Sequence, residues 1–288
     1  MEKATVYFTR TITPEQMIRM YQALGITLEG PVAVKVHSGE VGNQNFIRPA
    51  FLKPMIDYVD GTVVECNTAY QGKRYTAVDH WETMKKHGWT DLCRVDIMDE
   101  EGEISLPIPG GKRIQENFVG KNLENYRSLL VLSHFKGHPM GGFGGALKNI
   151  SIGIASSHGK AYIHGAGNPA ELWTADHDSF LESMADAASS IVTRFQGKSA
   201  YLNVMCNMSV DCDCCSVAED PKMADIGILA SLDPVALDQA CLDLVYQSDD
   251  PGKGDLIERI ESRHGILTVE AAAALGVGSR DYELIEVK

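Results

Sequence analysis

Short apolar runs rich in β-branched residues alternate with amphipathic helical segments along most of this 288-residue chain. The apolar runs predict strands at Thr5–Phe8, Val32–Val36, Thr62–Cys66, Leu129–Ser133, Ala200–Val204, Asp225–Ser231 and Tyr282–Val287. Helical periodicity marks Pro14–Leu24, Pro49–Val59, Val78–His87, Asp178–Phe195, a helix beginning at Asp233 and Pro234, Lys253–Arg263 and Val269–Leu275. Strands that alternate with helices favour an α/β fold of mainly parallel sheets covered by helices.

We expect this α/β fold to form two lobes, residues 1–120 and 121–288, with the functional site in the cleft between them. The joint lies near the segment 117–127, between the early and the late strand–helix units. The segment Asp99–Arg113 is rich in turn residues. It therefore predicts a hairpin or an excursion from the sheet.

Charge and hydropathy exclude two classes of partner. The net charge of −13 and a pI of about 5.1 argue against nucleic acid, because binding to phosphate backbones needs a basic surface. No apolar run approaches the roughly 20 residues that span a bilayer, and the N-terminal segment MEKATVYFTR is not typical of a signal peptide. We expect a cytoplasmic protein without a membrane partner, and the sequence leaves homo-oligomerisation open.

A glycine-rich segment follows the predicted strand Leu129–Ser133, with six glycines between Gly137 and Gly153. Such clusters let backbone amides approach an anion. A Walker loop needs lysine directly after glycine, whereas Lys148 follows Leu147. The dinucleotide fingerprint needs a glycine where Leu147 stands. Neither ATP nor NAD is therefore the favoured ligand.

Imidazole and ammonium groups are concentrated in and around the same segment. They belong to His134, Lys136, His138, Lys148, His158, Lys160 and His164. Cationic and imidazole groups around amide-rich loops suit carboxylate, phosphate or metal binding. We expect a small anionic ligand at Lys136, Gly144 and Gly145, and a divalent metal at His138 or His164. His37 is a further candidate, because it follows a strand at the edge where α/β sites gather.

Four of the seven cysteines lie in the ten residues CNMSVDCDCC, from Cys206 to Cys215. Cys212 and Cys215 have the spacing that lets two thiolates bind one metal. A turn with small buried cysteines explains the cluster equally well. Side chains of adjacent residues diverge, so Cys214 and Cys215 are not expected to bind the same ion.

Several phrases resemble one prokaryotic family, the domain-of-unknown-function family 362, which is labelled as uncharacterised iron–sulfur-centre proteins. They are VAVKVHSGE (32–40), IRP (47–49), NTAYQGKR (67–74), SHFKGHPMGGFGGALKN (133–149) and DIGILASLDPVALDQA (225–240). Many members carry a ferredoxin-like CxxCxxC insert after the position that matches His164. This chain has no cysteine from Ala166 to Gln196, so the resemblance implies an iron–sulfur cluster only if the later cysteine cluster supplies its ligands.

The intervals between His138, Lys148 and His164 are similar to those of the nickel-pincer lactate racemase family. Lys148 lies ten residues after His138, and His164 lies sixteen after Lys148. The resemblance implies proton chemistry at His138, a cofactor lysine at Lys148 and a nickel ligand at His164. It also implies that Arg48, in the phrase IRP, binds a carboxylate. Leu147 replaces the family's arginine, and Lys73 or Arg74 stands where its second catalytic histidine would be, so a related pocket is implied rather than the same reaction.

The sequence supports three hypotheses. The first is an isomerase- or lyase-type metalloprotein with catalytic His138 and Lys148, an anion held with Arg48 and Lys136, and zinc, iron or nickel. The second is a non-catalytic iron–sulfur or zinc carrier that uses Cys206–Cys215. The third is a binding module whose glycine-rich loop holds a phosphate-bearing partner.

Overall fold

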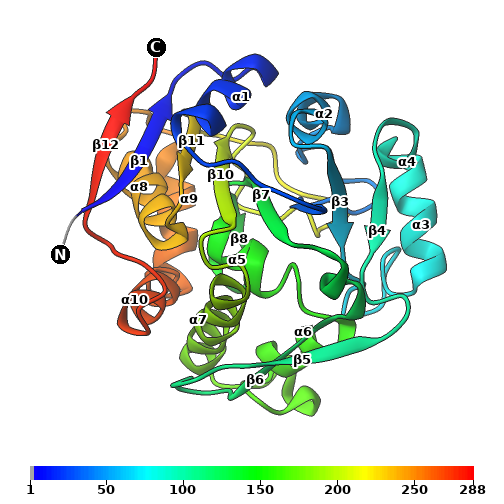
Figure 1. Ribbon diagram of the computed structural model, residues 1–288. Helices are drawn as coiled ribbons and strands as arrows, with labels where there is room; N and C mark the ends of the chain where they lie inside the picture. Colours follow the sequence, from blue (N-terminus) through cyan, green and yellow to red (C-terminus); the bar gives the residue numbers. More distant parts are fainter. Residues whose placement is uncertain (1–2) are drawn as a thin grey trace.

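The computed structural model describes residues 3–288, and its centre is a sheet of eight strands (Figure 1). In spatial order they are β12 (Tyr282–Glu286), β1 (Ala4–Thr9), β11 (Gly227–Ser231), β10 (Ser199–Met205), β7 (Ser128–His134), β2 (Val32–Lys35), β3 (Gly61–Glu65) and β4 (Val95–Ile97). β11 is antiparallel to β1 and β10, and the other neighbouring pairs are parallel. The predicted α/β fold with a mainly parallel sheet is confirmed.

Helices cover both faces of this sheet (Figure 1). One face is covered by α1 (Pro14–Ala23), α2 (Pro49–Tyr58), α3 (Ala77–Lys86) and α4 (Trp89–Leu92). The other is covered by α5 (Ala146–Ser151), α7 (His177–Arg194), α8 (Pro234–Gln247), α9 (Lys253–Ser262) and α10 (Ile266–Ala274). The central strand β7 explains this: Leu129 and Val131 pack into one core, while Leu130 and Leu132 pack into the other.

Two helix starts follow the capping chemistry that the sequence predicts. The side chain of Thr13 accepts a hydrogen bond from the backbone N–H of Gln16 at 3.2 Å, and Pro14 is the first residue of α1. The Asp233 carboxylate accepts hydrogen bonds from the N–H groups of Val235 and Ala236 at 2.8 and 3.0 Å. Such caps satisfy donors that have no partner inside the helix.

Smaller elements cross one end of the sheet. β5 (Glu103–Pro107) and β6 (Glu116–Gly120) form an antiparallel hairpin, as the turn-rich segment Asp99–Arg113 predicts. A second, short hairpin in the glycine-rich segment was not predicted. The remaining elements are β8 (Lys136–His138), β9 (Gly142–Gly144), α6 (Ser157–His164), and two 3₁₀ turns, η1 (Lys121–Asn125) and η2 (Pro169–Glu171).

The predicted division at residue 120 does not separate two sheets. Strands β1 to β4 precede that residue, and β7 and β10 to β12 follow it, yet all of them share the central sheet. β2 pairs directly with β7, and β1 lies between β11 and β12. Backbone hydrogen bonds of parallel and antiparallel ladders therefore join the two predicted lobes.

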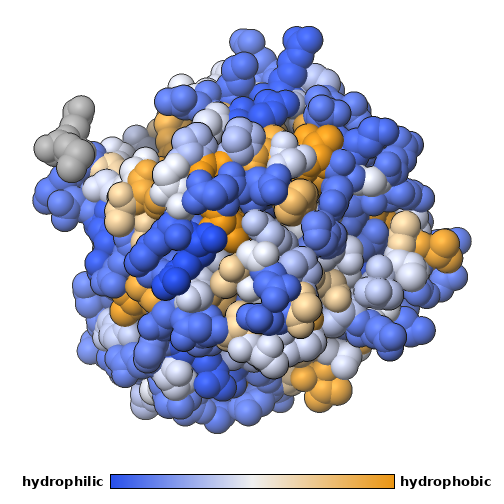
Figure 2. Space-filling view, turned by 90° about the horizontal axis from the view of Figure 1, so that it is seen from below, coloured by the Kyte–Doolittle hydropathy of each residue, from blue (hydrophilic) through white to orange (hydrophobic). Residues whose placement is uncertain are grey.

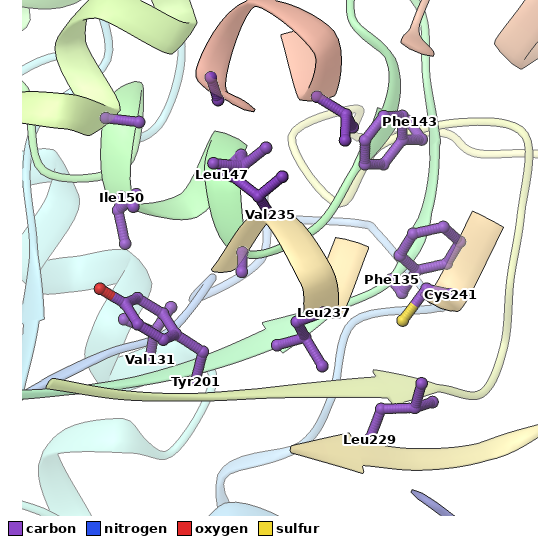
Figure 3. Packing of buried hydrophobic residues seen from close by; sticks show 14 of the residues in the cluster. Val131, Phe135, Phe143, Leu147, Ile150, Tyr201, Leu229, Val235, Leu237 and Cys241 are labelled. Atoms are coloured by element: carbon purple, nitrogen blue, oxygen red, sulfur yellow. The ribbon is translucent and has the colours of Figure 1, made fainter. Parts of the chain in front are cut away.

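The glycine-rich turn that precedes α5 differs from the predicted anion-binding loop. The buried Asp238 carboxylate of α8 accepts hydrogen bonds from the N–H groups of Ala146 and Leu147 at 2.8 and 2.9 Å. A Cβ on Gly145 would lie 2.4 Å from this carboxylate, so only glycine lets Asp238 approach. Figure 3 shows Leu147 of α5 beside Val235 of α8 in the same core. The amides at the start of α5 thus bind an internal carboxylate rather than an external anion.

The outer surface is mainly hydrophilic on the face shown in Figure 2, where hydrophobic residues form only small groups. No helix among residues 3–288 combines the length and apolarity needed to cross a membrane. A few large hydrophobic side chains are exposed, including Val217 at 86% and Trp173 at 64%. Trp173 also lies on the wall of a cavity of about 330 Å³.

Asp238→Asn should destabilise the fold without altering the cavity directly. Three donors converge on this carboxylate, the third being the Asn203 side-chain amide at 2.7 Å. Asparagine would turn an N–H group toward one of them, so we expect the free energy of unfolding at pH 7.5 to fall by about 1–3 kcal/mol. Urea denaturation measures this, with the exposed Asp249→Asn as the control. Equal stability of both variants would contradict the structural role of Asp238.

Candidate functional site

A cavity of about 330 Å³ lies beyond the carboxyl ends of β2 and β3. This volume is within the range of small-molecule sites. The predicted site residues on its wall are His37, His138, Lys148, His164 and Cys215. They come from segments far apart in the sequence, and the strand ends bring them together, as is general for sites in α/β sheets.

Four other predicted ligand-binding residues do not line this cavity. Arg48 is exposed, and its guanidinium lies 3.9 Å from the centre of the Phe46 ring while donating a hydrogen bond to the Gln44 carbonyl at 2.9 Å. Lys136 is buried 3.6 Å from Asp213. Gly144 and Gly145 lie in the turn that accommodates Asp238. The positions of these four residues therefore do not support the prediction that they contact the ligand.

Four cationic side chains and a single carboxylate line the cavity. The cations are Lys35, Arg74, Lys148 and Lys160, and the carboxylate is Glu65. Lys35 is paired with Glu65 at 2.6 Å, and Arg74 with Glu40 at 3.2 Å. Burial would raise the pKa of Glu65, but Lys35 and Arg74 lower it to about 2, so Glu65 stays charged although it is buried.

Lys148 differs from the other three cations. Lys160 donates to the Ala155 carbonyl at 2.6 Å, whereas the Lys148 ammonium has no hydrogen-bond or ion-pair partner within residues 3–288. Lys148 lies on α5, half-buried at the wall of the cavity. Its charge lowers the pKa values of His37, His138 and His164. An uncompensated positive charge thus lies on the wall of the cavity.

Three histidines on the wall are held in the neutral form. Burial is the main cause of the lowered pKa of each ring, and neighbouring cations lower it further. For His164, a hydrogen bond to the Lys160 backbone partly opposes this shift. The pKa of His138 falls to about 4, as does that of His164. The pKa of His37 lies well below its ordinary value. At neutral pH these rings can accept a proton or a metal, but they add no charge.

Hydrogen bonds give His138 and His164 opposite tautomers. The Nδ1 atom of His138 accepts N–H groups from Gly141 at 2.8 Å and Met140 at 3.2 Å, so the ring proton is on Nε2. The Nδ1 atom of His164 faces the Lys160 carbonyl at 2.8 Å and must donate, which leaves Nε2 as an acceptor. One ring can therefore donate a proton from Nε2 while the other accepts one.

Asp213 fixes the cysteine segment against the glycine-rich segment. Its carboxylate lies 2.9 Å from Nδ1 of His134 and 3.6 Å from the Lys136 ammonium, and all three residues are buried. Burial would raise the pKa of Asp213, but His134 and Lys136 lower it to about 2. The carboxylate that the sequence places between Cys212 and Cys214 is therefore paired with His134 and Lys136 and does not line the cavity.

The same arrangement creates a candidate metal cluster. One ligand atom each from His138, Cys212 and Cys214 lies within 4.8 Å of the other two. Of the predicted metal ligands, His138 and Cys212 belong to this group, while His164 and Cys215 line the cavity outside it. Cys206 is in no such group within residues 3–288. Imidazole with two thiolates is a donor set typical of zinc, and three protein ligands leave a position open.

Sequence reasoning missed several of these residues. Arg74, and not Arg48, is the arginine that reaches the cavity. His80 is fully buried, with Nδ1 3.2 Å from the Asn67 side chain. Cys66 also borders the cavity. The position of Lys35 and Glu65 at the ends of predicted strands was the available signal for the buried ion pair.

Comparison with known families now adds to this geometry. A family model described as Domain of unknown function (DUF362) matches residues 32–243. The chain belongs to the DUF362 family. The match includes most of the cavity wall, from His37 to the cysteine segment, and it confirms the family resemblance of the sequence phrases. No curated protein sequence matches this DUF362 chain significantly.

Two solved structures are similar to this chain at low sequence identity. The lactate racemase apoprotein from Thermoanaerobacterium thermosaccharolyticum is 13% identical, with a TM-score of 0.48, over 98% of this chain and 82% of the racemase. A protein from Thermotoga maritima is 14% identical, with a TM-score of 0.43, over 91% of this chain and 58% of its own. Similarities at this level carry no conclusion about the activity of the DUF362 chain.

Lys148→Met should raise the pKa of His164 above its value of about 4. Lys148 disfavours the imidazolium form, so removing its charge makes protonation easier. The fold should be unaffected, because the ammonium makes no hydrogen bond within the described residues. NMR titration of the His164 ring measures the shift, with exposed Lys198→Met as the control. An unchanged titration would mean that Lys148 does not face this ring.

Proposed function

We propose that this chain binds a small organic anion in the cavity and transfers a proton to or from it, with a divalent metal held on the cavity wall. The observation that carries the proposal is the uncompensated Lys148 ammonium, beside neutral His138 and His164. The activity expected from these groups is of the isomerase or lyase type. Catalytic roles for His138 and Lys148 belong to this proposal.

The charges of the cavity support binding of an anion. Ion pairs occupy Lys35 and Arg74, but Lys148 and Lys160 have no carboxylate within 4 Å among residues 3–288. Bringing a carboxylate or phosphate to Lys148 would supply the missing partner in a partly buried site, where such a contact is stronger than in water. The net charge of −13 for the whole chain does not oppose this, because exposed charges beyond a Debye length are screened.

The tautomers of the two histidines support proton transfer. His164 presents an acceptor Nε2 and His138 a protonated Nε2, and both rings line the same cavity. General acid–base catalysis needs one group to take a proton and another to return it. Lys148 would hold the anionic group and stabilise negative charge that develops as a neighbouring C–H bond loses its proton.

The donor set of His138, Cys212 and Cys214 fits a thiophilic divalent metal such as zinc or nickel. The metal would supply a Lewis acid beside the bound anion. Burial raises the thiol pKa of Cys212. The hydrogen bond with Cys212 would lower the thiol pKa of Cys214, but the hydrogen bond with Cys215 and burial outweigh it and raise that pKa. Nε2 of His138 carries a proton in the metal-free protein, and a metal bound there would replace that proton, so His138 cannot donate a proton while it holds the metal. Metal binding must therefore release protons from its ligands.

Isothermal titration calorimetry with propanoate and inorganic phosphate tests the anion site. Lys148→Met should weaken binding by about tenfold or more, the size expected for a lost charge-assisted hydrogen bond. Arg48→Ala should bind as the wild type does, because its side chain lies outside the cavity. A loss of affinity in Arg48→Ala with normal binding in Lys148→Met would overturn the proposed site.

Elemental analysis of untagged protein tests the metal site. Zinc or nickel should be lost on Cys212→Ser and on Cys214→Ser and retained on Cys206→Ser, since Cys206 lies outside the cluster. After dialysis against zinc, occupancy should be higher at pH 8 than at pH 6.5, because the raised thiol pKa values oppose binding at low pH. Stoichiometric iron with acid-labile sulfide, lost in Cys206→Ser, would instead support the carrier hypothesis.

A further inference from the structure

The cavity has a second chemical character besides its cations. Apolar and aromatic side chains make up much of the rest of its wall, among them Tyr70, Met140, Ile152, Leu172 and Trp173. A site for a bare inorganic anion would need polar groups on all sides. Apolar walls are instead typical of sites that bind a ligand with an apolar body and place a few polar groups to orient it.

Three of the cations are deeply buried, while the Trp173 side chain lies at the edge of the cavity. Lys35, Arg74 and Lys160 are each at least 92% buried, whereas 64% of Trp173 is exposed. Trp173 follows η2, and its ring centroid lies 5.9 Å from that of Tyr70, with the planes inclined by 51°. Lys35, Arg74 and Lys160 therefore lie deep in the cavity, Lys148 is half-buried on its wall, and Trp173 stands at its mouth with Tyr70 beside it.

Trp173 is unusual among the exposed hydrophobic residues of this chain. The others within residues 3–288, such as Val78, Val217 and Leu232, do not border this cavity. An indole ring left largely in water is costly unless something covers it, because aromatic side chains gain most from being buried. Flat aromatic groups pair favourably with such rings in offset or tilted arrangements.

The size of the cavity agrees with a ligand larger than a simple anion. About 330 Å³ corresponds to roughly ten water molecules in the liquid. A phosphate ion or a three-carbon acid at Lys148 would leave the apolar walls in contact with water. A ring attached to the anionic group at Lys148 would extend toward Tyr70 and Trp173 on the same cavity wall.

We infer that the ligand is an organic acid with a flat, apolar body, whose anionic group binds at Lys148 and whose ring is covered by Trp173 and Tyr70. This inference rests on the proposed function, because it adds a body to the anion that the proposal places at Lys148. Trp173 is then a residue that determines specificity. It has no part in proton transfer.

Three matched probes test the inference: 3-phenylpropanoate, propanoate, which lacks the ring, and 3-phenylpropanamide, which lacks the charge. Calorimetry on wild-type protein should show 3-phenylpropanoate binding about tenfold or more tightly than either of the others. Trp173→Ala should reduce the affinity for 3-phenylpropanoate to that for propanoate and leave propanoate binding unchanged. Trp173→Phe should retain most of the preference, since it keeps a ring at the mouth.

Tryptophan fluorescence gives an independent readout, since the chain contains Trp81, Trp89 and Trp173. 3-Phenylpropanoate should shift the emission of wild-type protein and of Trp81→Phe to shorter wavelength, but not that of Trp173→Phe. Equal affinities for 3-phenylpropanoate and propanoate, both dependent on Lys148, would overturn the inference and leave the anion site intact. Failure of both acids to bind wild-type protein would count against the proposed function as well.

Discussion

The buried contact of Asp213 with His134 and Lys136 holds together the two segments from which the site is built. His134 ends β7, Lys136 begins β8, and Asp213 lies in the cysteine segment some eighty residues later. Both ring nitrogens of His134 are used, since Nε2 lies 2.6 Å from the Cys206 carbonyl. A buried charge without its partner is strongly unfavourable, so moving the cysteine segment away would cost a large amount of free energy. The closeness of His138, Cys212 and Cys214 is a consequence of that constraint.

Periodicity in the sequence was sufficient for the main elements of the fold. The strands of the central sheet other than β4, and the longer helices, follow from apolar runs and caps, because each burial pattern is local. The cavity was only partly predictable. His37, His138, Lys148 and His164 were found through their concentration at strand ends and in one segment, and all of them line the cavity. Arg48 was selected from a phrase of three residues, and nothing in such a phrase shows that its guanidinium stacks on Phe46 instead.

Long-range partners explain the remaining errors. The turn at Gly144 and Gly145 has the composition of an anion-binding loop, and it does bind a carboxylate, but that carboxylate is Asp238. The partner lies more than ninety residues away, beyond the reach of any local pattern. Likewise, β2 of the first predicted lobe pairs with β7 of the second. Pairing between strands that are distant in the sequence cannot be detected from local composition. Residues with converging donors or charges can be recognised only when the chain is folded.

The position of β1 affects the order in which this protein can fold. β1 comprises Ala4–Thr9, yet its two sheet neighbours are β11 and β12, more than two hundred residues later. During synthesis β1 therefore cannot pair with its neighbours until nearly the whole chain has emerged, and its apolar residues Val6 and Phe8 remain unburied until then. Contacts of such high sequence separation are formed slowly. Meanwhile β2 and β3, whose carboxyl ends border the cavity, pair with each other, and β2 pairs with β7, within the first half of the chain, so this part of the site can begin to assemble before the sheet is complete.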